Sequence, residues 1–310
     1  MTDRRVLGFY KFMPVSDPGA LQHHLRAEGE RLNIKGTILL AEEGVNGTLV
    51  GTQLDLRRYQ KVLTDHFAEL PFKWSRLNEN NHGFYRFKVK VKPEIVSFGV
   101  EDLDIRLTGE HVNVEQWHAL LDDPDVVVVD TRNAYEVDIG TFPVALNPQT
   151  TNFREFPQWV KEHLDPDENK RVAMFCTGGI RCEKASAYMK QAGFESVYQL
   201  DGGVLRYLEE VAPDTNRWSG ECFVFDQRVS VNADLAQGQY QQCYACRHPL
   251  SASDLESKVY ELGVSCPHCA IASEGDEQAH AARKTSLRER QKQVELAQSR
   301  GAQHIGAPQE

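Results

Sequence analysis

The sequence predicts a multidomain α/β protein in which an N-terminal α+β domain precedes a central domain with a parallel sheet and a small cysteine-rich module. Three observations support this prediction. Strand and helix patterns in the first third follow the order βαββαβ, continuous apolar runs alternate with helical stretches in the middle, and two Cys-x2-Cys pairs come last. A chain of 310 residues is also long enough for two or three domains.

The N-terminal third, residues 1–92, has the element order of a ferredoxin-like split sandwich. Helical apolar spacing predicts its two helices, and alternation predicts its strands. Asn46-Gly47 supplies the turn chemistry of a hairpin between the second and third strands. The six expected elements are residues 6–12, 18–33, 35–43, 47–52, 54–67 and 85–93.

Charge is unevenly distributed along the chain. The net charge is -10, yet residues 1–100 contain 15 Lys and Arg against 11 Asp and Glu, so an anionic partner should meet this end of the protein. In the last predicted strand of this third, four cations share one face because side chains alternate along a strand. These cations either form the solvent-exposed face of a strand whose other face packs on the core, or they form a stripe that binds RNA phosphates. This basic stripe consists of Arg86, Lys88, Lys90 and Lys92.

The middle of the chain follows a different pattern. Residues 93–121 are predicted to connect the first domain to residues 122–215, which form the central domain. Its apolar runs are typical of buried parallel strands, and helical stretches separate them. The three runs are residues 125–130, 171–176 and 196–203.

The cysteine-rich module is predicted over residues 216–272, and residues 273–310 are predicted to be a polar, flexible tail. Four cysteines in two Cys-x2-Cys pairs, with 19 residues between the pairs, suit a structural zinc ion that would also supply folding energy. An iron–sulfur cluster or a metal-free site are the alternatives. The expected ligands of this zinc-ribbon-like module are Cys243, Cys246, Cys266 and Cys269.

The stretch CTGGIRC places a thiol, two glycines and an arginine where a buried strand meets a helix. Ligands bind at the carboxyl ends of strands in open sheets, and a helix N-terminus stabilises a thiolate. We therefore expect Cys176 to be a catalytic nucleophile beside the positive charge of Arg181, the alternative being an inert core cysteine. The loop between them is one residue shorter than in cysteine phosphatases and suits a terminal sulfur on the thiol. Its residues are Thr177, Gly178, Gly179 and Ile180.

Besides Cys176 and the four expected metal ligands, the sequence contains two more cysteines. Cys182, six residues after Cys176, either packs in the first turn of the helix or acts as a resolving thiol that reduces a persulfide or sulfenate at Cys176. Cys222 is most simply a core cysteine. Because the total of seven cysteines is odd and the chain shows no signal peptide, we expect reduced thiols that serve catalysis or metal binding.

Residues 124–213 resemble a rhodanese domain. VDTRNAYEVDIGTFPVA resembles the Asp-x-Arg opening of that family, CTGGIRC its active-site loop, and VYQLDGGV its closing strand and glycine pair. The match departs at Thr141, where many rhodaneses carry His. The matching residues are Asp130, Arg132, Glu136, Gly140, Gly202 and Gly203.

The wider chain, from residue 1 to about residue 270, resembles the bacterial tRNA uridine hydroxylase family through AEEGVNGTLVG, CTGGIRCEKA, CYACRHPL and SCPHC. This resemblance implies oxygen-dependent hydroxylation of the wobble uridine of tRNA to 5-hydroxyuridine, with Cys176 required. It also implies molecular oxygen as co-substrate and the tRNA anticodon stem-loop as partner. No Rossmann glycine fingerprint, haem motif or two-His-one-carboxylate pattern stands out in the sequence as an oxygen-activating cofactor site.

Two other functions each fit part of the sequence. A thiosulfate-type sulfurtransferase that forms a persulfide would use Cys176 and Arg181, and a non-catalytic RNA-binding scaffold would use the basic stripe and the cysteine-rich module. No apolar run approaches the 18 residues of a membrane span, so we expect a cytoplasmic protein without membrane contact. The sequence does not indicate an oligomeric state.

Overall fold

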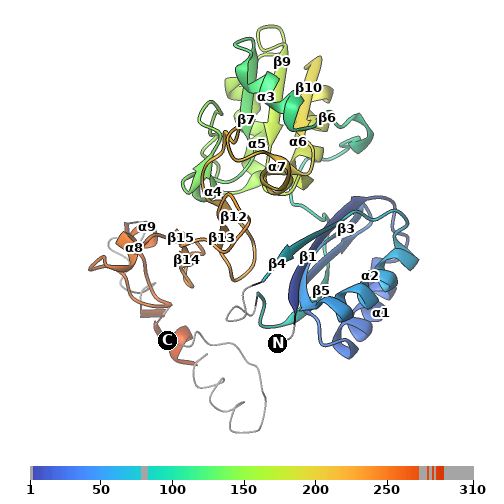
Figure 1. Ribbon diagram of the computed structural model, residues 1–310, viewed down its shortest axis with the longest axis vertical. Coiled ribbons are helices and arrows are strands. Elements are labelled where there is room, and N and C mark those ends of the chain that lie inside the picture. The colour runs from blue at the N-terminus through green and yellow to red at the C-terminus, as the bar shows by residue number, and fades with distance from the viewer. Residues whose placement is uncertain (1–2, 78–82, 272–277, 279–280, 283, 290–310) are drawn as a thin grey trace.

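The computed structural model describes residues 3–77, 83–271, 278, 281–282 and 284–289. Figure 1 shows an N-terminal sheet with two helices, a central sheet with helices around it, and a small module at the C-terminal side. The N-terminal sheet lies beside one end of the central sheet (Figure 1). The tail predicted over residues 273–310 falls mostly outside the described residues.

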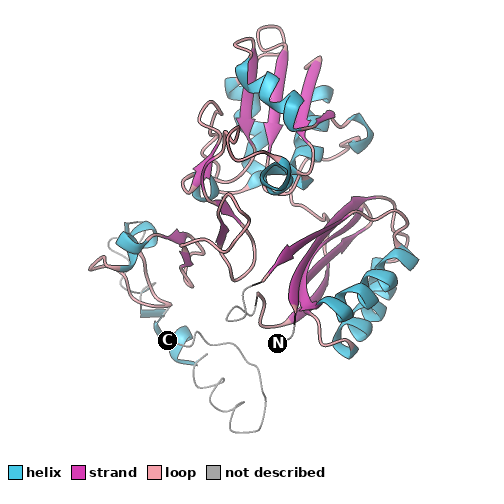
Figure 2. Ribbon diagram, in the orientation of Figure 1, coloured by secondary structure: helices cyan, strands magenta, loops and turns pink. Residues whose placement is uncertain are grey.

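The N-terminal sheet has the strand order β4-β1-β3-β2-β5. Helices α1 (Pro18–Arg31) and α2 (Gln53–His66) cover one of its faces, as Figure 2 shows, and apolar side chains of both layers form the core between them. Asp17 and Thr52 begin the helices, because their side chains accept hydrogen bonds from backbone N–H groups of the first turn. The strands are β1 (Arg4–Phe12), β2 (Lys35–Ala41), β3 (Gly44–Thr52), β4 (Phe72–Arg76) and β5 (Phe87–Val91).

The expected βαββαβ order is confirmed, but its last strand was wrongly assigned. The fourth strand of the unit is β4, whose side chains are only partly buried, so its sequence lacks a clear apolar alternation. The strand predicted over residues 85–93 is β5, an additional edge strand that pairs in parallel with β2.

The predicted hairpin turn is also wrong. Strands β2 and β3 are joined at Glu42 and Glu43, whereas Asn46 and Gly47 lie within β3. Tertiary contacts explain the difference, because the Glu43 carboxylate pairs with the Lys184 ammonium of the central domain at 2.8 Å and also accepts a backbone hydrogen bond.

The central sheet contains four parallel strands in the order β6-β10-β9-β7. The three predicted apolar runs are confirmed as strands β7 (Val126–Asp130), β9 (Arg171–Phe175) and β10 (Ser196–Leu200). The edge strand β6 (Glu110–Val112) lies in the stretch expected to be a connection, which also contains a 3-10 turn (Ile105–Leu107). The surrounding helices are α3 (Val114–Asp122), α4 (Ala134–Val137), α5 (Phe156–His163), α6 (Ile180–Gln191) and α7 (Gly203–Glu210), with a second 3-10 turn at Phe153–Glu155.

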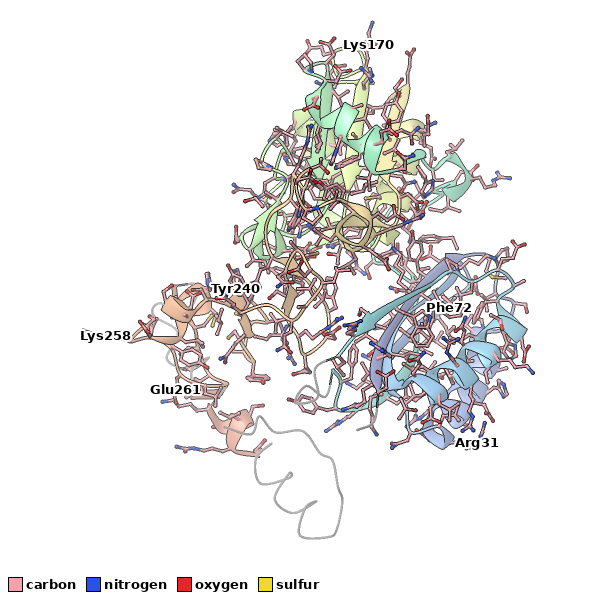
Figure 3. The ribbon with its side chains drawn as sticks, viewed as in Figure 1. Arg31, Phe72, Lys170, Tyr240, Lys258 and Glu261 are labelled. Atoms are coloured by element: carbon pink, nitrogen blue, oxygen red, sulfur yellow. The ribbon has the colours of Figure 1, made fainter. Side chains whose placement is uncertain are left out.

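The direction of the central strands positions the site. Lys170 stands just before β9 at the end of the central domain away from the N-terminal sheet (Figure 3). The carboxyl ends of the strands, and the loops that follow them, therefore face the N-terminal sheet.

Short strand pairs follow the central domain. β8 (Gly140–Thr141) pairs with β11 (Ser219–Gly220), β12 (Cys222–Phe223) with β13 (Ser230–Val231), and β14 (Gln241–Gln242) with β15 (Pro249–Leu250). Cys222 is fully buried in the central core, as expected. The module is completed by α8 (Ala252–Leu255) and α9 (Pro267–Ile271).

Among the helices of the described residues, none has the length and apolar character needed to cross a membrane.

Candidate active site at the domain interface

Cys176 directly follows β9 and begins the loop that enters α6, where the sequence analysis placed it. The residue is only 1% exposed, and the backbone N–H of Gly179 donates to its Sγ at 3.1 Å. Gly179 has a φ of 100°, a conformation that favours glycine. The loop thus holds the thiol at a helix N-terminus with an N–H group directed at the sulfur.

The surroundings of Cys176 favour the thiolate. Burial by itself would raise the pKa of the thiol, because it penalises the charged form. A hydrogen bond from the Cys182 thiol, the positive charge of Arg181 and the backbone N–H groups of these two residues outweigh burial and lower the pKa of Cys176 to about 5. Cys176 is therefore ionised at neutral pH, which is the form that acts as a nucleophile.

Arg181 is held by a carboxylate rather than by the thiol. Its two terminal nitrogens donate to Glu136 at 2.6 and 2.7 Å, and both side chains are buried. The hydroxyl of Thr177 donates to the same carboxylate at 3.3 Å. This pair fixes the cation near Cys176, and a fixed charge needs no reorganisation when a reaction begins.

The Asp-x-Arg opening forms a second buried ion pair next to the first. Arg132 donates to Asp130 at 2.6 and 2.9 Å and to the carbonyl of Gly140 at 2.6 Å. Thr141 donates its hydroxyl to Asp130 at 2.9 Å, so the residue that departs from the rhodanese pattern supports this pair. The residues of the Asp-x-Arg opening therefore form a buried scaffold that supports the active-site loop.

Cys182 lies in the first turn of α6 and is completely buried. Its Sγ is 3.6 Å from the hydroxyl of Thr131, and burial together with the neighbouring Cys176 thiolate raises its pKa. Cys182 is consequently a neutral thiol that donates a hydrogen bond to Cys176. This arrangement is compatible with packing and with a resolving role.

Two side chains of the N-terminal domain contact the active-site loop and the residues next to it. The sequence analysis did not place either of them near the thiol. Lys73 of β4 extends across the interface and donates from Nζ to the carbonyls of Gly178 at 2.7 Å and Gly202 at 2.6 Å. Tyr10 of β1 donates to Glu183 of α6 at 3.1 Å. Burial lowers the pKa of Lys73, although the Cys176 thiolate opposes this effect.

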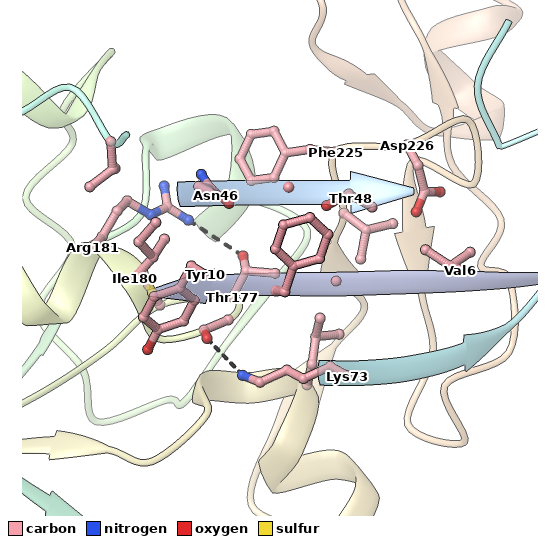
Figure 4. Close-up of a pocket in the computed structure, with 18 of the residues that line it drawn as sticks. Val6, Tyr10, Asn46, Thr48, Lys73, Thr177, Ile180, Arg181, Phe225 and Asp226 are labelled. Carbon is pink, nitrogen blue, oxygen red and sulfur yellow. Dashed lines mark hydrogen bonds between the residues drawn. The ribbon is translucent and has the colours of Figure 1, made fainter. Parts of the chain in front are cut away.

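Cys176 opens onto a cavity of about 1030 Å³ between the two domains. The open face of the N-terminal sheet contributes Asn46 and Thr48, and the active-site loop contributes Ile180 (Figure 4). A third side is closed by Val224, Phe225, Asp226 and Arg228. A cavity of this size lies at the upper end of those that bind small ligands.

The basic stripe lies on β5 and the residues beside it, and all four of its cations are exposed. Lys88 pairs in register with Thr37, and Lys90 with Leu39. Because paired residues share a face of the sheet, the stripe is on the same face as Thr37 and Leu39, which line the cavity.

The four-cysteine cluster is assembled as the sequence predicts. The Sγ atoms of its four cysteines all lie within 4.8 Å of one another, and those of Cys246 and Cys266 are 3.7 Å apart. Tetrahedral zinc–sulfur bonds of about 2.3 Å require sulfur atoms about 3.8 Å apart. The cluster could therefore hold a metal such as zinc. The rings of His248 and His268 stack beside the cluster at 3.7 Å, with His248 partly buried and His268 exposed.

Residues 4–95 match the family described as the UPF0176 acylphosphatase-like domain, and residues 113–210 match the rhodanese-like domain family.

Among solved structures, the chain is similar to a rhodanese-related protein from Thermoplasma volcanium, with 20% identity, a TM-score of 0.27, and coverage of 34% of this chain and 95% of that one. It is similar to a rhodanese-like domain from Anabaena, with 16% identity, a TM-score of 0.29, and coverage of 36% and 78%. It is also similar to an acylphosphatase from Coxiella burnetii, with 12% identity, a TM-score of 0.22, and coverage of 29% and 94%.

The predicted fold class is confirmed: an acylphosphatase-like N-terminal domain, a rhodanese-like parallel sheet and a C-terminal cysteine cluster. The rhodanese-like domain indicates an enzyme with a catalytic cysteine, and its combination with the N-terminal domain supports a sulfurtransferase-like or tRNA-modifying role. The order of these two domains is the architecture of the tRNA uridine hydroxylase (UPF0176) family, as the motifs of the sequence predict.

Proposed function

We propose that this protein hydroxylates C5 of the wobble uridine of tRNA, giving 5-hydroxyuridine, with molecular oxygen as co-substrate and Cys176 as nucleophile. The position of Cys176 is the observation that carries this proposal. A thiol with a pKa of about 5 lines a cavity of about 1030 Å³ that two domains share. A nucleotide needs such room, whereas thiosulfate needs far less.

The thiolate suits the chemistry of this reaction. Attack of the Cys176 sulfur at C6 of uracil would break the C5–C6 double bond and place negative charge on C5 and the C4 oxygen. C5 could then attack an oxygen donor, and loss of the C5 proton with departure of the thiolate would restore the double bond. The base is thereby oxidised by two electrons. Molecular oxygen supplies one atom to C5, and the other leaves as water after it takes up two electrons and two protons from a separate co-substrate, a soluble two-electron donor that is oxidised in the step.

The basic stripe is suited to hold the rest of the RNA. A wobble base must leave the anticodon stack to reach a buried thiol, so the stem and loop need a grip on their backbone. Burial and the positive charges of Lys90, Arg86 and Arg247 lower the pKa of Lys88. An RNA phosphate at this position would relieve the repulsion among these cations.

Nucleoside analysis of tRNA from a deletion strain tests the proposal. Loss of 5-hydroxyuridine, restored by the wild-type gene but not by Cys176→Ser, is the expected result, because the change removes the thiolate and little volume. A melting curve of the purified variant checks that it is folded. Normal levels of 5-hydroxyuridine in the deletion or with Cys176→Ser would overturn the proposal.

A persulfide-forming sulfurtransferase of the thiosulfate type is the second candidate, favoured by the low pKa of Cys176 and the short loop. It predicts that thiosulfate converts Cys176 to a persulfide and that cyanide then yields thiocyanate, with tRNA nucleosides unchanged in the deletion strain. A non-catalytic RNA-binding scaffold predicts instead that Cys176→Ser has no effect in either assay.

A further inference from the structure

The loop between β12 and β13 has a strained backbone and lies outside both matched family regions. Val229 has a φ of 64°, which is uncommon and unfavourable for a β-branched residue. Two backbone hydrogen bonds hold the conformation, from Val224 N–H to Val229 O at 2.9 Å and from Val229 N–H to Asp226 O at 3.0 Å. Such strain persists only where surrounding contacts enforce it, and it concentrates at functional sites.

The same loop is anchored to the N-terminal domain. Asp226 and Arg228 form a buried ion pair at 2.6 Å. Arg228 also donates to the hydroxyl of Ser75 at 3.0 Å and to the carbonyl of Arg76 at 3.2 Å, both on β4. The internal ion pair and these contacts with the N-terminal domain therefore fix the loop that closes the third side of the cavity.

This fixed loop presents one aromatic ring to the cavity. Phe225 is 58% exposed, although its neighbours Phe223 and Val224 are buried. Its ring packs edge-on against Phe223 at 5.1 Å, and the Arg181 guanidinium lies 5.8 Å from the ring centroid. Figure 4 shows Phe225 among the residues that line the cavity, between Arg181 and Asp226.

We propose that Phe225 is the platform on which one unstacked pyrimidine base of the RNA rests while it reacts with Cys176. The inference rests on the proposed function and adds the residue that holds the base. A flipped base needs a flat apolar surface to replace its lost neighbours, and every base has a π face that stacks on an aromatic ring. Phe225 supplies such a surface in the cavity that contains the thiol, and the strained loop keeps it from collapsing onto the core.

A thermodynamic cycle tests this role. The binding of an anticodon stem-loop is compared with that of the same stem-loop lacking the wobble base, for the wild type and for Phe225→Ala. Base stacking on an aromatic side chain is worth roughly 5- to 150-fold in affinity. Phe225→Ala should weaken binding of the complete stem-loop within this range and leave binding of the abasic one unchanged. Phe225→Trp should retain the wild-type affinities.

Leu54→Ala is the matched control, because Leu54 is 59% exposed and lies on α2, which covers the other face of the N-terminal sheet. It should bind both RNAs as the wild type does. The rate of Cys176 alkylation is also measured as a function of pH. If its midpoint is the same in Phe225→Ala as in the wild type, the variant keeps the active-site loop folded.

Equal effects of Phe225→Ala on both RNAs, or no effect on either, would overturn the platform. If the wild type forms 5-hydroxyuridine while the cycle shows no coupling, the platform alone is wrong. A wild type that neither binds the stem-loop nor modifies it would reject the proposed function together with the platform.

Discussion

Replacing Cys182 separates the two roles that its thiol can have beside Cys176. The Cys182 hydrogen bond is the largest of the effects that lower the pKa of Cys176 to about 5. A hydrogen bond to a charged group contributes about 1.5–3 kcal/mol, and one pKa unit corresponds to about 1.4 kcal/mol. Cys182→Ala should therefore raise the pKa of Cys176 by about one to two units. Cys182→Ser keeps a donor and should change the pKa little.

The rate of alkylation by iodoacetamide as a function of pH measures this pKa. The rate rises with pH through the pKa and then levels off, because only the thiolate reacts. Trypsin releases residues 172–181 as a peptide in which Cys176 is the one cysteine, so mass spectrometry follows this thiol alone. An unchanged midpoint in Cys182→Ala would refute the assignment of Cys182 as the donor. If Cys182 is a resolving thiol, it attacks a persulfide at Cys176 and releases the outer sulfur as sulfide. Both variants should then lose this release, and Cys182→Ser should lose it although the midpoint of its alkylation profile is normal.

Four further predictions concern the contacts of the active-site loop, the cysteine cluster and the basic stripe. Lys73→Met should cost about 2 kcal/mol of unfolding free energy, because two carbonyls lose a charged donor, and Lys73→Arg should cost less; urea denaturation measures both. Glu136→Gln should cost about 3–5 kcal/mol of unfolding free energy, because Arg181 stays buried without its paired carboxylate, whereas the double change with Arg181→Met should cost less than the sum of the two single changes. Protein purified without chelator should contain one zinc ion for the four cysteines, and a metal content near zero with the module still resistant to protease would contradict this. Lys88→Ala with Lys90→Ala should weaken tRNA binding and reduce its salt dependence by roughly one log–log unit per lost phosphate contact, while Arg26→Ala with Arg31→Ala on α1 should not.

The sequence was most informative where neighbouring residues make the site. The strand, the loop and the helix around Cys176 are contiguous, so the order of apolar run, glycines and arginine predicts the geometry of the thiol. The four-cysteine cluster was predictable for a related reason, since a Cys-x2-Cys spacing brings two sulfur atoms together by itself.

Contacts between distant segments could not be predicted in this way. Lys73 reaches carbonyls that are 105 and 129 residues further along the chain, and no local pattern distinguishes it from other lysines of a mixed strand. The hairpin turn was misplaced for the same reason. Asn46-Gly47 has the better local turn chemistry, yet the ion pair of Glu43 with Lys184 places the turn against the other domain.

Gly179 shows how the two domains depend on one another at the thiol. Its φ of 100° is one reason why the position requires glycine. The second reason lies in the N-terminal domain, because a Cβ atom at this position would lie 2.7 Å from the Tyr10 hydroxyl. That hydroxyl is held by Glu183, two residues beyond Arg181 on the same helix. A side chain at position 179 would therefore strain the loop and displace the Tyr10 hydroxyl from its hydrogen bond with Glu183. The N–H group directed at Cys176 and the wall of the cavity thus depend on the same glycine.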